Sequence, residues 1–233
     1  MGFDPTVYIA FQEKGPEVKD LKSEDLDVPF DSRVYENQGK KFLEEGDLKK
    51  AESFLVKALV KAPWNDRLHS ALGNLYLKAN KIQAAVQEFQ SSLNLNPHSE
   101  EALLGLSLAS FMMGDFEKSF LYPKKILEFS PESDDAFSWL GVLSLKKGEF
   151  LKALQSFEMA LNINPNNLTA HLGRGHAFAA AGLLKDAVFS FEKAVESSPE
   201  SVEAYTGLRD CLEFMGEKEQ AERISKFLLK MKT

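Results

Sequence analysis

The chain has 233 residues, of which 44% are hydrophobic and 27% charged, a composition typical of a globular protein. Its net charge of −7, without a basic block, argues against nucleic-acid binding. The single cysteine, Cys211, excludes a disulfide within the chain. No apolar stretch is long enough to span a membrane and no signal peptide is visible, so we expect a cytoplasmic protein without direct membrane insertion.

Residues 1–31 form an acidic N-terminal segment with eight acidic residues and three lysines. The segment also contains an apolar run from Val7 to Phe11 and does not fit the repeats that follow. It is therefore either a flexible tail or a segment that docks on the rest of the chain or on a partner.

Residues 32–233 repeat with a period of 34 residues. Three series carry this period: the prolines Pro63, Pro97, Pro131, Pro165 and Pro199; the turn residues Gly46, Asn80, Gly114, Gly148, Gly182 and Gly216; and the large residues Leu55, Phe89, Phe157 and Phe191. Glycine adopts the left-handed conformation at least cost, so the turn series predicts where a first helix ends. Proline cannot continue a helix, so the proline series predicts where a second helix ends. The large residues are expected to fill the space between helix pairs.

Apolar spacing within each unit is helical. In residues 149–163, Phe150, Ala153, Leu154 and Phe157 follow the i, i+3, i+4, i+7 pattern. No segment shows the sustained alternation of a strand, so we predict an all-α protein. The expected units are 32–65, 66–99, 100–133, 134–167, 168–201 and 202–233.

The order of residues in each unit resembles the tetratricopeptide repeat. The fourth unit carries the pattern in Phe137, Leu140, Gly141, Ala153, Phe157, Ala160 and Pro165. The resemblance implies a right-handed α-solenoid of about six helix-turn-helix repeats. Three positions depart from the pattern: Arg209, Ser225 and Pro123. Because Pro123 falls inside a second helix, we expect it to bend or interrupt that helix and to make the third repeat a flexible joint.

Residue patterns for catalysis are absent from the sequence. His171 and His176 are five residues apart, which does not place two metal ligands on one helix face. Gly173 and Gly175 lack the third glycine and the preceding strand of a phosphate-binding loop. We therefore expect no enzyme activity, no cofactor and no metal.

The resemblance implies that the first helix of each repeat lines a concave groove. The expected partner-binding residues are Arg33, Lys40, Arg67, Asn74, Lys78, Leu104, Leu108, Phe111, Met112, Val142, Leu145, Leu172 and His176. Together they predict a groove of mixed charge near its N-terminal end and apolar in its middle. Alternatively, Leu104, Leu108 and Phe111 pack against neighbouring helices.

The leading hypothesis is a protein-interaction scaffold or adaptor for complex assembly, which binds a peptide or helix of a partner protein in this groove. Two alternatives stay open. One is a structural component that self-assembles as a homo-oligomer, and the other is the substrate-recruiting subunit of an enzyme complex.

Overall fold

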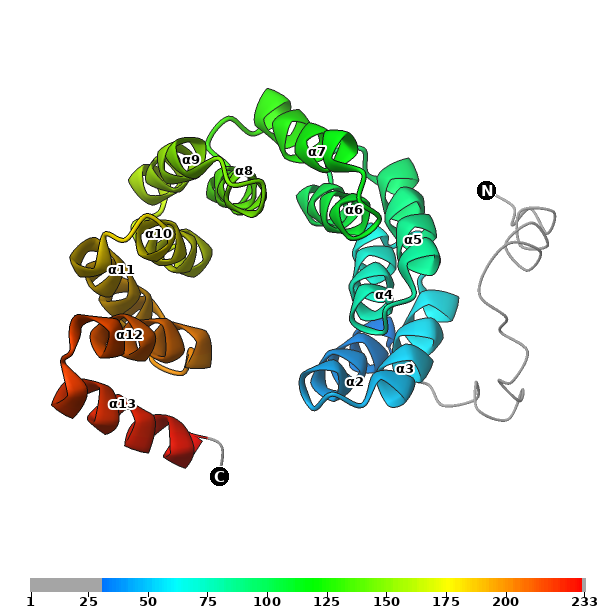
Figure 1. Cartoon of the computed structure of the whole chain (residues 1–233). Coiled ribbons are helices and arrows are strands. Elements are labelled where there is room, and N and C mark those ends of the chain that lie inside the picture. Colours follow the sequence, from blue (N-terminus) through cyan, green and yellow to red (C-terminus); the bar gives the residue numbers. More distant parts are fainter. Residues whose placement is uncertain (1–30, 232–233) are drawn as a thin grey trace, which may run out of the picture. The chain divides into compact units, whose positions relative to one another are not determined.

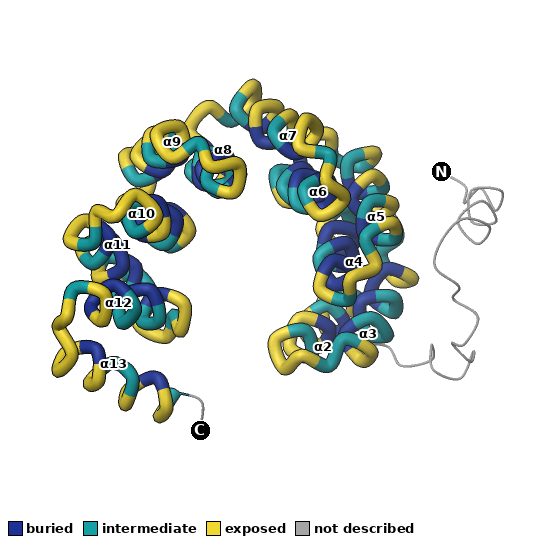
Figure 2. The backbone as a smooth tube through the Cα atoms, viewed as in Figure 1, coloured by how far each residue is buried: buried dark blue, intermediate teal, exposed yellow. Residues whose placement is uncertain are grey.

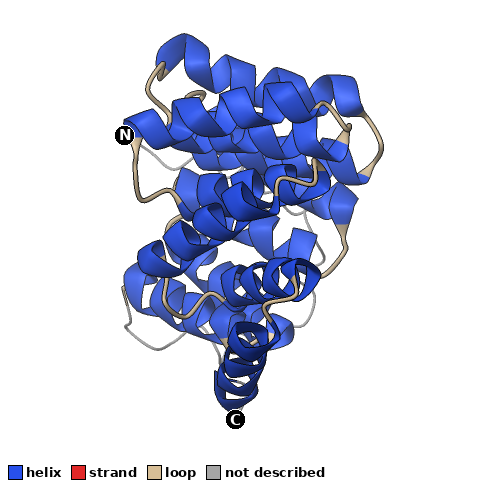
Figure 3. Ribbon diagram, turned by 60° about the vertical axis from the view of Figure 1, so that its left-hand side comes forward, coloured by secondary structure: helices blue, strands red, loops and turns tan. Residues whose placement is uncertain are grey.

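The structure, a computed structural model, describes residues 31–231. Over this range the chain forms twelve α-helices and no strand (Figures 1 and 3). The helices are α2 (Ser32–Glu44), α3 (Leu48–Lys61), α4 (Asp66–Lys78), α5 (Ile82–Leu95), α6 (Glu100–Met112), α7 (Phe116–Phe129), α8 (Asp134–Lys146), α9 (Phe150–Ile163), α10 (Leu168–Ala180), α11 (Leu184–Ser197), α12 (Val202–Met215) and α13 (Lys218–Met231). First and second helices alternate with the predicted period, and the predicted all-α helical-repeat fold is confirmed.

Polar side chains mark where most helices begin. The carboxylate of Asp47 accepts a hydrogen bond from the backbone N–H of Lys50 at 3.1 Å, and the amide oxygen of Asn167 accepts one from Ala170 at 2.8 Å. The same arrangement occurs at Asp31, Asn65, Ser99, Asp115, Ser133 and Ser201. Because the first N–H groups of a helix have no partner within it, these side chains stabilise each start.

The predicted turn series ends the first helix of every repeat. Its five glycines have φ angles between 76° and 84°, and Asn80 has a φ of 57°. Only residues that tolerate the left-handed region fit there without strain, which explains the choice of glycine or asparagine. This prediction is confirmed.

The phenylalanines of the large-residue series form the centre of the packing between repeats. Phe157 is fully buried, and a Cβ atom placed on Gly141 or Gly173 would come within 2.5 or 2.2 Å of its ring. The backbones of α8 and α10 therefore close on one ring, and dark blue buried positions line the helices where they meet (Figure 2). Phe89 and Phe191 have equivalent glycine neighbours, so the predicted packing role is confirmed.

The size of the central residue varies together with the residue that follows it 16 positions later. The pairs are Leu55 with Ala71, Phe89 with Gly105, Pro123 with Trp139, Phe157 with Gly173, and Phe191 with Gly207. A full phenylalanine ring thus goes with glycine, a smaller leucine goes with alanine, and the small proline goes with tryptophan. Because interiors are close-packed, this inverse relation conserves volume where successive repeats meet.

Pro123 is buried within α7, which continues on both sides of it. The predicted interruption of this helix is therefore wrong, whereas a bend at Pro123 and a flexible joint in the third repeat stay predictions. The chain divides into two compact units, a first unit up to Met113 and a second unit from Gly114. The boundary falls between the two helices of the third repeat. Within the first unit α6 packs on α4 and α5, and within the second α7 packs on α8.

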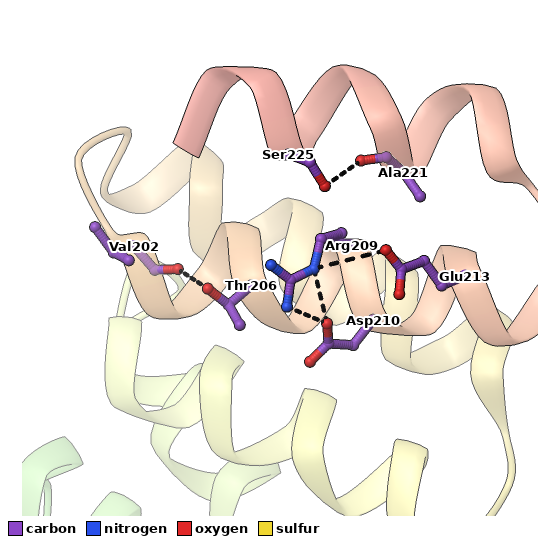
Figure 4. A network of polar contacts seen from close by, with 7 residues as sticks. All are labelled: Val202, Thr206, Arg209, Asp210, Glu213, Ala221 and Ser225. Carbon is purple, nitrogen blue, oxygen red and sulfur yellow. Dashed lines mark hydrogen bonds and ion pairs between the residues drawn. The ribbon is translucent and has the colours of Figure 1, made fainter. Parts of the chain in front are cut away.

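Arg209 and Ser225 of the last repeat form polar contacts within their own helices (Figure 4). The Nε of Arg209 donates to the carboxylate of Asp210 at 2.9 Å and lies 4.0 Å from that of Glu213. The hydroxyl of Ser225 donates to the carbonyl of Ala221 at 3.0 Å. These two departures from the repeat pattern are thus accommodated by local bonds.

Candidate partner-binding site

The predicted site residues all lie on first helices, and the boundary between the units divides them into two sets. The first unit holds Arg33 and Lys40 on α2, Arg67, Asn74 and Lys78 on α4, and Leu104, Leu108, Phe111 and Met112 on α6. The second unit holds Val142 and Leu145 on α8 and Leu172 and His176 on α10.

A polar cluster connects α2, α4 and α6 within the first unit. The side-chain amide of Asn74 donates to the carboxylate of Glu101 at 2.7 Å. Partial burial raises the pKa of Glu101, and the positive charges of Lys40 and Arg67 act in the opposite direction. The contact between Asn74 and Glu101 therefore joins a predicted residue of α4 to α6. Lys40 also forms a 2.6 Å ion pair with Glu36 on its own helix.

The apolar residues of α6 in this unit are only partly open. Leu104, Leu108 and Phe111 are half-buried, whereas Met112 is 41% exposed. α6 is apolar around most of its circumference, so its remaining surface needs cover from the neighbours α4 and α5. We name the exposed and half-buried predicted residues of α2, α4 and α6 the first-helix face; it combines cations with a modest apolar area.

In the second unit the predicted residues contribute to packing as well as to surface. Val142 and Leu145 pack against the buried cluster around Phe157. Leu172 packs against the cluster around Phe191, and the ring of His176 meets Phe191 edge-on with 5.1 Å between ring centroids. The predicted apolar residues here are therefore partly core, and His176 keeps an exposed edge 3.3 Å from Glu203.

A groove that the sequence analysis did not predict lies within the second unit, on the side of the second helices. It runs between α7, the end of α8 and the start of α9 and has a volume of about 790 Å³. Its lining consists of Phe116, Glu117, Phe120, Leu121, Lys124, Leu140, Ser144, Lys147, Glu149, Lys152, Gln155 and Ser156. We call it the α7–α9 groove.

The signal for this groove is present in the sequence, at the eleventh position of each repeat. The series reads Phe42, Tyr76, Ser110, Ser144, Phe178 and Leu212. A large residue here fills space between helices, so a serine in its place removes volume. The prediction missed the groove because the resemblance directed attention to the concave-groove positions of the first helices, and Ser144 is not one of them.

Two buried pairs of polar side chains, both in the first unit, form structural contacts. The ring of His69 lies 2.7 Å from the carboxylate of Glu88, and the hydroxyls of Ser70 and Ser92 are 2.9 Å apart. Burial raises the pKa of the Cys211 thiol, which disfavours the reactive thiolate. Among residues 31–231 no group of three potential metal ligands converges, and no helix of that range is long and apolar enough to cross a membrane.

The acidic segment lies almost wholly outside the described residues. Docking of its apolar run, Val7 to Phe11, on the first-helix face therefore stays a prediction.

Sequence profiles of the tetratricopeptide repeat family match the chain over residues 42–91 and, in a second profile, over residues 70–133 and 145–202. Among individual proteins, the chain is 35% identical over 79 residues to the BBSome complex member BBS4 of Bos taurus. That alignment covers 34% of this chain and spans only 15% of the bovine protein.

Solved structures with a similar fold include a tetratricopeptide repeat protein from Parabacteroides merdae, with a TM-score of 0.58 and 23% identity over 86% of this chain and 79% of that chain. The type IV pilus biogenesis factor PilW matches with a TM-score of 0.66 and 19% identity, over 84% of this chain and 91% of its own. Pseudomonas aeruginosa pilF matches with a TM-score of 0.63 and 17% identity, over 86% of this chain and 91% of its own. At these identities the likeness shows the fold alone.

Proposed function

Since the chain belongs to the tetratricopeptide repeat family, whose members generally mediate protein–protein interactions, we propose that it is a non-catalytic scaffold that binds a peptide or helix of a partner protein on its first-helix face. The observation that carries the proposal is the combination on α2, α4 and α6 of exposed cations with half-buried apolar residues. Arg33, Arg67 and Lys78 are exposed on α2 and α4, and Leu104 and Leu108 are half-buried on α6.

The chemistry of this face favours a partner segment that carries both carboxylates and apolar side chains. Exposed arginine and lysine side chains attract acidic partners and fix their orientation, although each contributes little affinity by itself. Burial of apolar area on α6 supplies the larger part of the affinity. The proposal therefore assigns affinity to Leu104, Leu108 and Met112 and orientation to Arg67 and Lys78.

Site-specific crosslinking tests the proposal directly. A photoreactive amino acid is placed at Leu108 of the full chain and, as a matched control, at the exposed Lys185 on the second helix α11. Crosslinked proteins from cell extract are identified by mass spectrometry, and the main product is then purified. We expect one dominant partner from position 108 that is absent from position 185.

Charge reversal then tests the orienting role. In titration calorimetry with the purified partner, Arg67→Glu together with Lys78→Glu should weaken binding about tenfold or more, which is about 1.4 kcal/mol. Lys185→Glu should leave binding unchanged. Equal crosslinking from both positions, or unchanged affinity of the double variant, would contradict the proposal.

A further inference from the structure

The second and fourth repeats place different residues at the same position of the fold. Tyr76 of α4 is 1% exposed, and its hydroxyl donates to the carboxylate of Glu52 on α3 at 2.9 Å. The ammonium group of Lys81, just ahead of α5, lies 5.3 Å from the centre of the Tyr76 ring and 3.5 Å from Glu52. An aromatic ring beneath a lysine therefore fills the space between three successive helices in the first unit.

The equivalent space in the second unit is the α7–α9 groove. Ser144 occupies the position of Tyr76, and Phe120 of α7 occupies that of Glu52. Ser144 is buried at the groove and Phe120 is half-buried, while Phe116 and Leu121 on the rim are 49% and 46% exposed. An opening with apolar side chains on α7 and α8 therefore lies where the Tyr76 ring lies in the second repeat.

We propose that the α7–α9 groove receives an aromatic side chain from an acidic segment of a partner protein. The inserted ring lies where Tyr76 lies in the second repeat, over Ser144 and against Phe120. Aromatic side chains that enter a preformed pocket bury a large apolar area at a small entropic cost and dominate the affinity of many interfaces. This surface is formed by the second helices α7 and α9 together with one side of α8, and it lies in the second unit, so it goes beyond the first-helix face and does not depend on it.

Charge at the groove defines the rest of the partner. Lys147 and Lys152 pair with Glu149 at 2.8 and 2.9 Å, and these two cations lower the pKa of Glu149. Lys124 on α7 adds a third cation to the lining, and its side chain is exposed. Glu117 is the second acidic residue of the lining, so three lysines face two glutamates. The groove therefore carries a positive excess on a chain whose net charge is −7. Carboxylates next to the inserted ring would meet these lysines.

The position of Lys147 beside Phe120 also favours an aromatic side chain as the occupant of the groove. The ammonium group of Lys147 lies 5.9 Å from the centre of the Phe120 ring. A cation held beside an aromatic wall can interact with a second ring placed in the groove, as Lys81 does with Tyr76. An aliphatic side chain of similar size would lose this contribution.

The test measures fluorescence anisotropy of a labelled, end-blocked pentapeptide with tryptophan between two pairs of glutamates, titrated with the full chain. Companion peptides replace the tryptophan with alanine or the glutamates with lysines. We expect the acidic tryptophan peptide to bind and each companion to bind about tenfold more weakly or worse. Lack of binding of the first peptide at millimolar protein, or equal binding of all three, would overturn the proposal.

Variants of the chain locate the binding. Ser144→Tyr fills the groove with the ring that the second repeat carries, and it should abolish peptide binding while the melting temperature is kept or raised. Lys124→Glu changes only an exposed side chain, so it tests the charge without affecting folding, and it should weaken binding severalfold. Lys185→Glu, and Arg67→Glu with Lys78→Glu, should bind as the unaltered chain does; this separates the groove from the first-helix face. Undiminished binding by Ser144→Tyr and Lys124→Glu would overturn the assignment.

A second copy of the chain is the competing occupant, because Tyr8 and Phe11 lie among acidic residues in the N-terminal segment. Light scattering over a range of concentrations distinguishes it. A constant monomer mass supports a separate partner protein. A mass that rises with concentration, and that Ser144→Tyr returns to the monomer value, would overturn the partner assignment in favour of self-association.

Discussion

The second and fourth repeats share one backbone plan and differ in what fills it. In the second repeat Tyr76 closes the space between α3, α4 and α5 and extends the core. In the fourth repeat Ser144 leaves the corresponding space open to solvent as the α7–α9 groove. The comparison shows that one position of the repeat belongs to the core where it carries Tyr76 and lies at an open groove where it carries Ser144.

The first helices of the two repeats have the same extent. α4 and α8 have the same length, and each is followed by a residue in the left-handed conformation. Around the groove, α7 and α8 keep their capped starts, Gly148 keeps its left-handed turn and α9 keeps the buried Phe157, whereas α7 carries Pro123 at its central position. A repeat can therefore lose one large side chain and gain a surface for binding.

The largest effect should follow from removal of the ring that fills the second repeat. Tyr76→Ser creates in the first unit the opening that Ser144 leaves in the second. Truncation of a fully buried aromatic residue typically lowers the free energy of unfolding by about 3–5 kcal/mol. Urea denaturation measures the change, with Tyr205→Ser at a half-buried site as the milder control. An unchanged midpoint would show that Tyr76 does not support the repeat.

The second helices α7 and α9 should differ in the stability of their backbone hydrogen bonds, because only α7 contains a proline. Pro123 cannot donate a hydrogen bond to the preceding turn, and a proline inside a helix costs about 3 kcal/mol. We expect backbone amides at 119–122 to exchange hydrogen faster than the equivalent amides at 153–156. Pro123→Ala should slow the exchange in α7. Equal protection of the two helices in the unaltered chain would rule out a weakened α7.

A third prediction uses the inverse relation between the central residue and the position that faces it. Gly173→Ala places a Cβ atom about where it would meet the Phe157 ring, and overpacking of this kind costs about 1–3 kcal/mol. Adding Phe157→Leu should recover part of the loss, because the first repeat pairs Leu55 with Ala71. A double-mutant cycle from thermal unfolding gives the coupling. If the two substitutions changed the free energy of unfolding in a strictly additive way, the volume at this contact between repeats would not be conserved as a pair.

The smallest predicted effect concerns the hydroxyl of Tyr76. Tyr76→Phe removes the hydrogen bond to Glu52, worth about 0.5–1.5 kcal/mol. Burial and the bond to Glu52 raise the pKa of Tyr76, so folding favours its protonated form. This contribution is complete below the unfolded-state pKa, near 10, and is lost as pH rises above it. The free energy of unfolding of Tyr76→Phe should therefore depend less on pH above 10 than that of the unaltered chain. Identical pH profiles of the two proteins would contradict this.

The fold could be predicted from the sequence because most repeats carry the same local signals. Gly148 ends a first helix, Pro165 follows a second helix, and Phe157 lies between them in the core, so the period alone places twelve helices in the described range. The signals agree with one another at every level, which is why the helix positions were predictable.

The candidate site was less predictable because it depends on contacts between repeats. Nothing in the period indicates that Asn74 binds Glu101, or that Val142 and Leu145 pack partly into the core. The groove at Ser144 is a difference from the repeat pattern, and a search for conserved features of the pattern does not find it. Differences between equivalent positions are therefore more informative about function here than the repeat itself.

A crystal structure of the Ser144→Tyr variant tests most directly whether one side chain decides between core and surface. The account predicts that the new ring lies buried between α7 and α9 against Phe120, as Tyr76 lies beside Glu52, with α7, α8 and α9 unmoved. A ring that points into solvent, or helices that shift to admit it, would show that the groove is not the empty counterpart of the Tyr76 site.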